Sequence, residues 1–164
     1  MSDTITKIDA KAEMAKWTRQ LAGMYVADLK ALDETAILNS AGGTARTVGD
    51  FTAEVSGFNL MTAKKLGGED FPARTDEEKA AFTALFSSKD VCIKMLSSSA
   101  EELASAIESA SEESMTEVVT LPWGQDMSKW ELANLCANHI LYHDGQLNFI
   151  QSLSGDGEMH WFDK

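Results

Sequence analysis

Two histidines four residues apart, His139 and His143, have the type and spacing of metal ligands. In a helix, positions i and i+4 lie on one face, so two imidazoles at this spacing can reach one metal ion. The second nitrogen of each ring then stays available for a hydrogen bond to a supporting group. Such a pair alone does not define a site, because core or surface histidines also share a helix face by chance. A third ligand from another part of the chain is needed.

The two histidines belong to a stretch whose pattern predicts one helix, residues 128–153. A capping box formed by Ser128 and Glu131 marks its start, and a glycine-rich turn ends it. At about 100° per residue, the helix face around His139 collects mainly apolar side chains: Leu132, Leu135, Cys136, His143, Gln146, Leu147, Ile150 and Leu153. We therefore expect both imidazoles to point into a core, where their nitrogens need polar partners.

Glu54 is the candidate for the third ligand. A capping box formed by Thr47 and Asp50 starts a second predicted helix, residues 47–66, which two glycines then stop. Within this helix Glu54 lies in the middle of an apolar face, within about 60° of its apolar neighbours, which are Phe51, Phe58 and Met61. An ionised carboxylate inside a core is costly unless it is paired or coordinated. Glu54 should therefore have a cationic partner.

Three explanations for Glu54 remain open from the residues alone. A lysine or arginine from another helix reaches it, or it lies near enough to one end of the bundle to stay hydrated, or it coordinates a metal ion with His139 and His143. Two neutral nitrogens and one anionic oxygen form a three-ligand set for a divalent cation. Cys136 and His160 are further candidates, although a free cysteine is more often a small buried hydrophobe and a histidine near a terminus is more often at the surface.

Helical spacing of apolar residues predicts two more helices. The first covers residues 9–36. The other follows a capping box at residues 75–78 and carries an apolar stripe over 82–107; it is either one long helix or one that the serines at 97–99 break. Residues 118–124 predict a short extended piece that ends in a turn and covers one end of a bundle.

Length and composition favour one globular domain, residues 1–164, with 44% hydrophobic residues. The net charge of −12 disfavours binding to nucleic acids or anionic membranes. No run of residues is apolar enough for a membrane span, and the first seventeen residues lack the apolar centre of a signal peptide. Cys92 and Cys136 both fall within predicted helices, so we expect reduced thiols in a soluble, cytoplasmic protein.

Residues 139–147, HILYHDGQL, resemble the last-helix signature of the DinB-like (YfiT-like) four-helix-bundle family. The helix entry at 47–50 and the Pro-Trp-Gly turn at 122–124 are also similar to that pattern, and the resemblance covers most of the chain. It implies an all-α, four-helix bundle with up-down-down-up topology, often as a homodimer. It also implies a metal ion held by one histidine of the second helix and two of the fourth.

His139 and His143 match the two ligands of the fourth helix, whereas Glu54 stands where the family usually has histidine. Members of known activity include transferases of low-molecular-weight thiols, such as bacillithiol or mycothiol, and a thiol-dependent isomerase. The resemblance thus implies an enzyme that uses a divalent ion (zinc, nickel or iron) to activate a thiol or water against a small-molecule substrate. Tyr142 and Gln146 are candidates to orient the substrate or the ligands.

Two other functions are compatible with the same residues. The first is a catalytically inactive bundle that binds a small molecule or a partner protein and retains a metal site modified at position 54. The second is a purely structural dimer in which Glu54 pairs with a lysine or arginine. Metal content and the partners of Glu54 separate these three possibilities.

Overall fold

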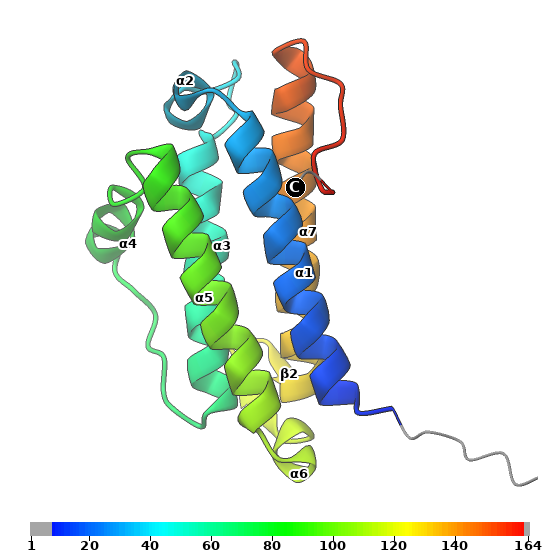
Figure 1. The fold of residues 1–164 in the computed structure, drawn as a ribbon. Helices are drawn as coiled ribbons and strands as arrows, with labels where there is room; N and C mark the ends of the chain where they lie inside the picture. Colours follow the sequence, from blue (N-terminus) through cyan, green and yellow to red (C-terminus); the bar gives the residue numbers. More distant parts are fainter. Residues whose placement is uncertain (1–7, 163–164) are drawn as a thin grey trace, which may run out of the picture.

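A computed structural model describes residues 8–162. Outside the described residues lie 1–7 and 163–164. The first of these ranges begins the segment for which no signal peptide is expected. Four long helices form a bundle (Figure 1): α1 (Ala10–Ala31), α3 (Val48–Leu66), α5 (Lys89–Ser109) and α7 (Lys129–Leu153). Both α1 and α3 pack against α5 and α7, so the order around the bundle is α1, α5, α3, α7.

The helix directions give the predicted up-down-down-up topology. In Figure 1, α1 and α7 rise whereas α3 and α5 descend. Because α3 and α5 are parallel neighbours, the chain must return along the bundle between them, and this crossover carries the short helix α4 (Asp76–Thr83). The predicted all-α four-helix bundle with this topology is confirmed.

The remaining elements close the ends of the bundle. The short helices α2 (Glu34–Leu38) and α6 (Glu112–Met115) lie at opposite ends in Figure 1. Strands β1 (Val118–Thr120) and β2 (Asp126–Ser128) form an antiparallel hairpin before α7, with Val119 opposite Met127. The turn between them uses Gly124 at φ 86°, in the left-handed region that glycine adopts without strain. The predicted extended piece with a turn is therefore present as a β-hairpin.

Two predicted helices have different bounds in the structure. The first, 9–36, is two helices, because Leu32 takes an extended conformation (ψ 146°) and ends α1 before α2 begins. The apolar stripe at 82–107 is also interrupted, but between α4 and α5 rather than at the serines. Within α5 the Ser99 hydroxyl donates to the Leu96 carbonyl at 3.0 Å, so this serine is accommodated in the helix.

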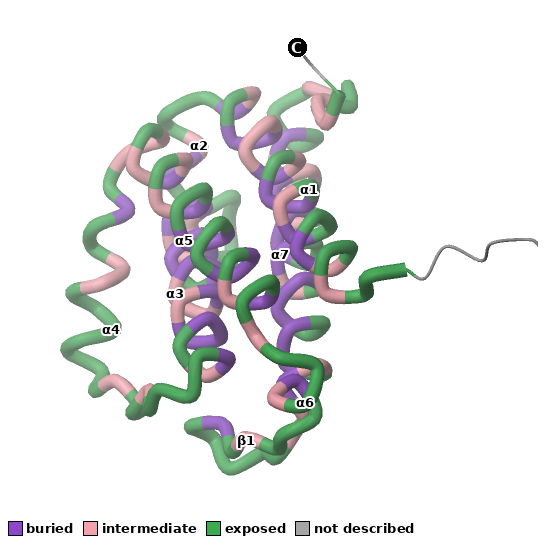
Figure 2. Tube along the Cα trace, turned by 60° about the horizontal axis from the view of Figure 1, so that its bottom comes forward, coloured by how far each residue is buried: buried purple, intermediate pink, exposed green. Residues whose placement is uncertain are grey.

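The apolar core fills the centre of the bundle. Figure 2 shows the buried residues on the inner sides of the four long helices, whereas α4 has no buried residue. The helices contribute large side chains to the core, among them Tyr25, Leu29, Phe51, Leu96, Ile140 and Leu147. Both cysteines are free and buried, as expected. Among residues 8–162, no helix is long and apolar enough to cross a membrane.

Candidate metal centre

The three predicted ligands meet between α3 and α7. The Nε2 atoms of His139 and His143 are 3.1 Å apart. Oε1 of Glu54 lies 3.2 Å from Nε2 of His139 and 3.6 Å from Nε2 of His143. Within residues 8–162, this is the one group of three or more histidine, cysteine or acidic side chains that converges closely enough to hold a metal ion.

The spacing of these atoms fits the coordination shell of one small cation. Metal–ligand bonds of about 2.0–2.2 Å in a tetrahedral arrangement place neighbouring ligand atoms about 3.3–3.6 Å apart. The three observed separations, 3.1, 3.2 and 3.6 Å, centre on the lower end of that range. Three protein ligands also leave a coordination position for water or substrate, as catalytic zinc sites do.

The orientation of His143 is fixed by its neighbours. Its Nδ1 lies 2.7 Å from the side-chain carbonyl Oε1 of Gln146, which can only accept, so Nδ1 carries the proton and Nε2 presents a lone pair. The Phe51 ring stacks on the imidazole at 5.5 Å, with an interplanar angle of 12°. Phe58 packs edge-on against His139 at 5.0 Å. These contacts hold both rings toward Glu54.

Glu54 lies at the rim of the bundle. Its side chain is 45% exposed, so the carboxylate is partly hydrated, as one of the open alternatives allowed, and is not enclosed in the apolar core. Its Oε2 makes an ion pair with Arg46, while Oε1 faces the histidines. Arg46 precedes α3 rather than coming from another helix, so the expected cationic partner exists but has a different origin. The close approach of His139 and His143, followed by the ion pair with Arg46, holds the pKa of Glu54 well below its usual range.

The two supporting residues lie beside His143. Gln146 accepts from the imidazole and its amide nitrogen donates to the Tyr142 hydroxyl at 3.4 Å, while the Tyr142 ring packs edge-on against His143 at 4.9 Å. Tyr142 is 63% exposed and faces solvent. Two other residues assigned to the inward face, Leu135 and Leu153, are also exposed, because this side of α7 faces solvent along part of its length.

Cys136 and His160 are not part of the cluster. Cys136 is fully buried and its thiol donates to Oδ1 of Asn59 at 3.2 Å. Burial raises the pKa of this thiol to about 12, so it stays protonated and is a poor metal ligand. His160 lies after α7 and contacts Oδ2 of Asp156 at 2.9 Å.

An apolar cavity of about 570 Å³ opens beside the cluster. Glu54 and His139 line it together with aromatic side chains from α3, the crossover and the β-hairpin, namely Phe58, Phe71 and Trp123. A ligand in this cavity would therefore contact two of the three candidate metal ligands. Cavities of this size, mostly apolar with a few polar groups, are typical of small-molecule sites.

Cationic residues of this region, among them Arg46 and Arg74, were not singled out from the sequence. Arg46 balances the charge of Glu54, and Arg74 lines the cavity. A basic residue just before a helix whose face carries an acid is a signal that could have suggested Arg46. Arg74 lies in the crossover, where the sequence carries no periodic pattern from which its position could be derived.

The fold and the cluster define a four-helix bundle with two histidines and one carboxylate converging between two of its helices. No family model matches the sequence, and no curated protein matches it. The fold is similar to the crystal structure of a mutant of the mycothiol-dependent maleylpyruvate isomerase, with a TM-score of 0.71 and 17% identity over 84% of this chain. The chain spans 60% of the length of that protein. A conserved protein from Enterococcus faecalis is also similar, with a TM-score of 0.72 and 12% identity over 90% of this chain and 98% of the other.

Proposed function

We propose that this protein is a metal-dependent enzyme in which Glu54, His139 and His143 hold one divalent ion such as zinc, nickel or iron. The observation that carries the proposal is the triangle of ligand atoms, with sides of 3.1, 3.2 and 3.6 Å. Lone pairs and a carboxylate charge that face each other at this distance repel unless a proton or a cation lies between them. The donor set, two nitrogens and one oxygen, suits a borderline transition metal.

The surrounding residues would prepare the site for chemistry. Gln146 keeps the proton of His143 on Nδ1, away from the ligand atom. Arg46 balances the charge of Glu54, which limits the negative charge that the site presents to an anionic nucleophile. A divalent ion bound here would lower the pKa of a coordinated water or thiol and supply the nucleophile at neutral pH. The adjoining cavity would hold a small electrophilic substrate against that nucleophile.

The proposed reaction is transfer of a low-molecular-weight thiol to an electrophile, or hydrolysis of a small substrate. The thiol reaction is supported by the shared fold with a protein whose name states dependence on mycothiol. Hydrolysis is supported by the site alone, because three protein ligands leave room for a water. Comparing turnover of an electrophilic substrate with and without added thiols separates the two reactions.

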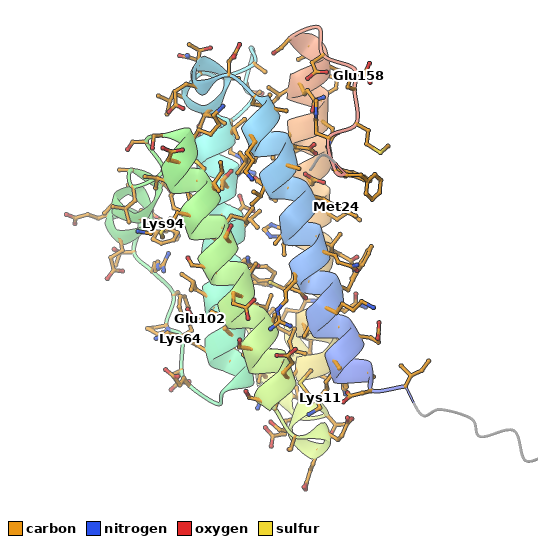
Figure 3. The ribbon with its side chains drawn as sticks, in the orientation of Figure 1. Lys11, Met24, Lys64, Lys94, Glu102 and Glu158 are labelled. Carbon is orange, nitrogen blue, oxygen red and sulfur yellow. The ribbon has the colours of Figure 1, made fainter. Side chains whose placement is uncertain are left out.

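The experiment that tests the proposal is metal analysis of protein purified without a polyhistidine tag. We expect about one divalent ion per chain, since one cluster of this kind is present in the described residues. Glu54→Ala and His143→Ala should lose the ion. Glu102→Ala, an exposed acid of α5 (Figure 3), and His160→Ala are matched controls that should keep it. Metal retained in both cluster variants would reject this ligand set.

A second candidate function is a non-catalytic bundle that binds a small molecule or a partner protein. The ion pair between Arg46 and Glu54 favours it, because the guanidinium already satisfies one carboxylate oxygen and competes with a cation for it. In that case the wild-type protein would bind added zinc no more tightly than Glu54→Ala does. The cavity would still bind ligands.

We also propose that the protein forms a homodimer through α7. After Glu131, the exposed residues of α7 carry no formal charge, although 24% of the residues in the chain are charged. The exposed apolar side chains are Leu135, Leu141, Tyr142, Phe149 and Leu153. Two acidic copies repel least where neither presents charge. Sedimentation should give a dimer for the wild type, a monomer for Phe149→Lys, and a dimer for the exposed control Leu85→Lys.

A further inference from the structure

The cavity beside the cluster has apolar walls and a cationic side. Its aromatic and aliphatic walls come from α3, the crossover and the hairpin, and include Phe58, Met61 and Trp123. Besides Glu54 and His139, its charged or titratable lining residues are Arg74 and Lys79, both cationic. A second hollow of about 390 Å³ shares these two cations and Glu54 with it. This concentration of positive charge contrasts with a chain that carries 26 acidic and 14 basic residues.

Arg74 lies in a rigid setting that leaves its donors free. The guanidinium carbon is 4.3 Å from the ring centroid of Phe82 and 5.4 Å from that of Phe71. Arg74 also lies close to α3 at Gly57, where a Cβ would be in ordinary van der Waals contact with its Nη1 at 3.6 Å and with the Phe82 ring at 3.4 Å. Stacking on aromatic faces fixes a guanidinium plane without consuming its N–H groups.

The other two arginines of the chain are satisfied by carboxylates. Arg19 binds Glu101 and Glu108, and Arg46 binds Glu54. Among residues 8–162, no carboxylate oxygen lies within 4.0 Å of the Arg74 guanidinium, and its side chain donates no hydrogen bond. A guanidinium is always charged and presents five N–H donors in a fork that matches a carboxylate or phosphate. Arg74 therefore has unused capacity for an oxyanion inside the cavity.

We propose that this cavity binds a small organic anion whose apolar body packs against Phe58 and Trp123 and whose carboxylate or phosphate group binds Arg74. This deepens the proposed function and rests on it for the reaction, which would occur at the part of the ligand nearest His139. Lys79 adds charge at the cavity edge, but its ammonium is already paired with Asp76 at 3.0 Å. Arg74 is thus the residue that determines selectivity for anions.

The test measures binding of three matched ligands to the full-length protein by NMR titration. The ligands are 3-phenylpropanoate, its phosphonate analogue 2-phenylethylphosphonate, and the neutral 3-phenylpropanamide. We expect one of the anions to bind at least about 10-fold more tightly than the amide, since charge-assisted, bidentate hydrogen bonds are about twice as strong as neutral ones. Which anion binds more tightly identifies the acidic group. Each titration is made on protein as purified and after removal of metal, so that binding to an ion is distinguished from binding to Arg74.

Three variants complete the test. In Arg74→Gln the preference for the anion should fall to about 2-fold or less, and Arg74→Lys should keep part of it, because the charge remains without the fork. Lys94→Gln, which removes one positive charge from an exposed position of α5 outside the cavity (Figure 3), should leave the preference unchanged. An unchanged preference in Arg74→Gln, or no preference in the wild type, would overturn the proposal.

Failure of this inference and failure of the proposed function give different results. If the wild-type protein holds no metal but the anion preference depends on Arg74, the enzyme proposal fails and the anion site stands. If metal binding depends on Glu54 and His143 while Arg74→Gln keeps the anion preference, the metal site stands and the anion site fails. Metal content of Arg74→Gln, expected to equal that of the wild type, shows that the two sites are separate.

Discussion

His143 and Asp144 are neighbours in α7, and both are buried, but their side chains enter two different polar clusters. His143 meets His139 and Glu54 on the side of α3. Asp144 pairs with Asp28 on the side of α1, and the backbone of α7 separates the two clusters. Both contain buried titratable groups, and only one has the features of a functional site.

In the aspartate pair on the α1 side, one carboxylate oxygen accepts hydrogen bonds from two nitrogen donors. Oδ2 of Asp28 accepts from Nδ2 of Asn148 at 2.6 Å and from Nε1 of Trp161 at 2.8 Å. Burial, followed by the charge of Asp28 and a hydrogen bond to it, raises the pKa of Asp144 to about 8. The two carboxyl groups therefore share a proton at neutral pH, which removes one of the two charges.

The cluster on the α3 side differs in its ligands and in its access. Two histidines and one carboxylate present three ligand atoms to one point. The aspartate pair offers carboxylates alone, and Oδ2 of Asp28 accepts from two N–H donors. Glu54 also borders a cavity. Burial of polar groups is therefore not enough to indicate a site, because a proton and N–H donors can stabilise such a cluster. Convergent ligand atoms with access for a ligand are the distinguishing features.

The largest effect is expected from His139→Ala, which breaks the α3-side cluster. Removal of one of three ligands should lower metal affinity by at least about 100-fold, more than the loss of a supporting hydrogen bond. The side chain of His139 is only 20% exposed, but it lies at the cavity edge, so stability of the metal-free protein should change little by comparison. Competition with a chromophoric chelator measures the affinity. An affinity equal to wild type would contradict the site.

Asp28→Ala should have the opposite effects to His139→Ala: it should lower stability and leave metal affinity unchanged. It leaves the half-buried N–H groups of Asn148 and Trp161 without their acceptor, so we expect a loss of about 2 kcal/mol in the free energy of unfolding. Metal affinity should equal that of the wild type. Urea unfolding measures the first and chelator competition the second. Asp28→Asn, which keeps an acceptor oxygen, should lose less, and a drop in metal affinity in either variant would show that the two clusters are coupled.

Gln146→Leu tests the orientation of His143. Without the carbonyl that accepts from Nδ1, the imidazole can carry its proton on Nε2, the atom that faces Glu54. We expect metal affinity to fall by about 10-fold, the usual size for loss of such a supporting hydrogen bond. Gln146→Glu keeps an acceptor and should retain the affinity. A 10-fold loss in both variants would indicate that packing rather than the hydrogen bond matters.

The two clusters also show what could be predicted from the sequence. The capping boxes at Thr47, Thr75 and Ser128 are local, so the starts of α3, α4 and α7 were found from residue types alone. His139 and His143 share one helix, and Glu54 was conspicuous among apolar neighbours, so the candidate ligands could be named.

The remaining contacts join residues that are distant in sequence. Asn148 and Asp28 are 120 positions apart, and no pattern in either helix indicates the other. Asp144 follows His143 directly in the sequence, but its burial against α1 depends on how α1 and α7 pack. The exposure of Glu54 also depends on packing, because a cavity borders its side of α3. Such features need the three-dimensional arrangement.

The last variant, Asp144→Asn, tests the proton shared by the aspartate pair. The pKa of Asp144 is about 8 in the folded protein against an ordinary value of 3.8, so between these values the folded state binds a proton that the unfolded chain releases. Wild-type stability should therefore fall as pH rises through this window. Asparagine stays neutral and can still donate to Asp28, so the variant lacks this slope. We expect the two proteins to be equally stable near pH 4. At pH 8 the variant should be the more stable by up to about 5 kcal/mol, because each unit of pKa shift corresponds to about 1.4 kcal/mol. Urea unfolding across this range, with metal-free protein, measures the difference, and a variant that is less stable at every pH would show that the pair is not held together by a shared proton.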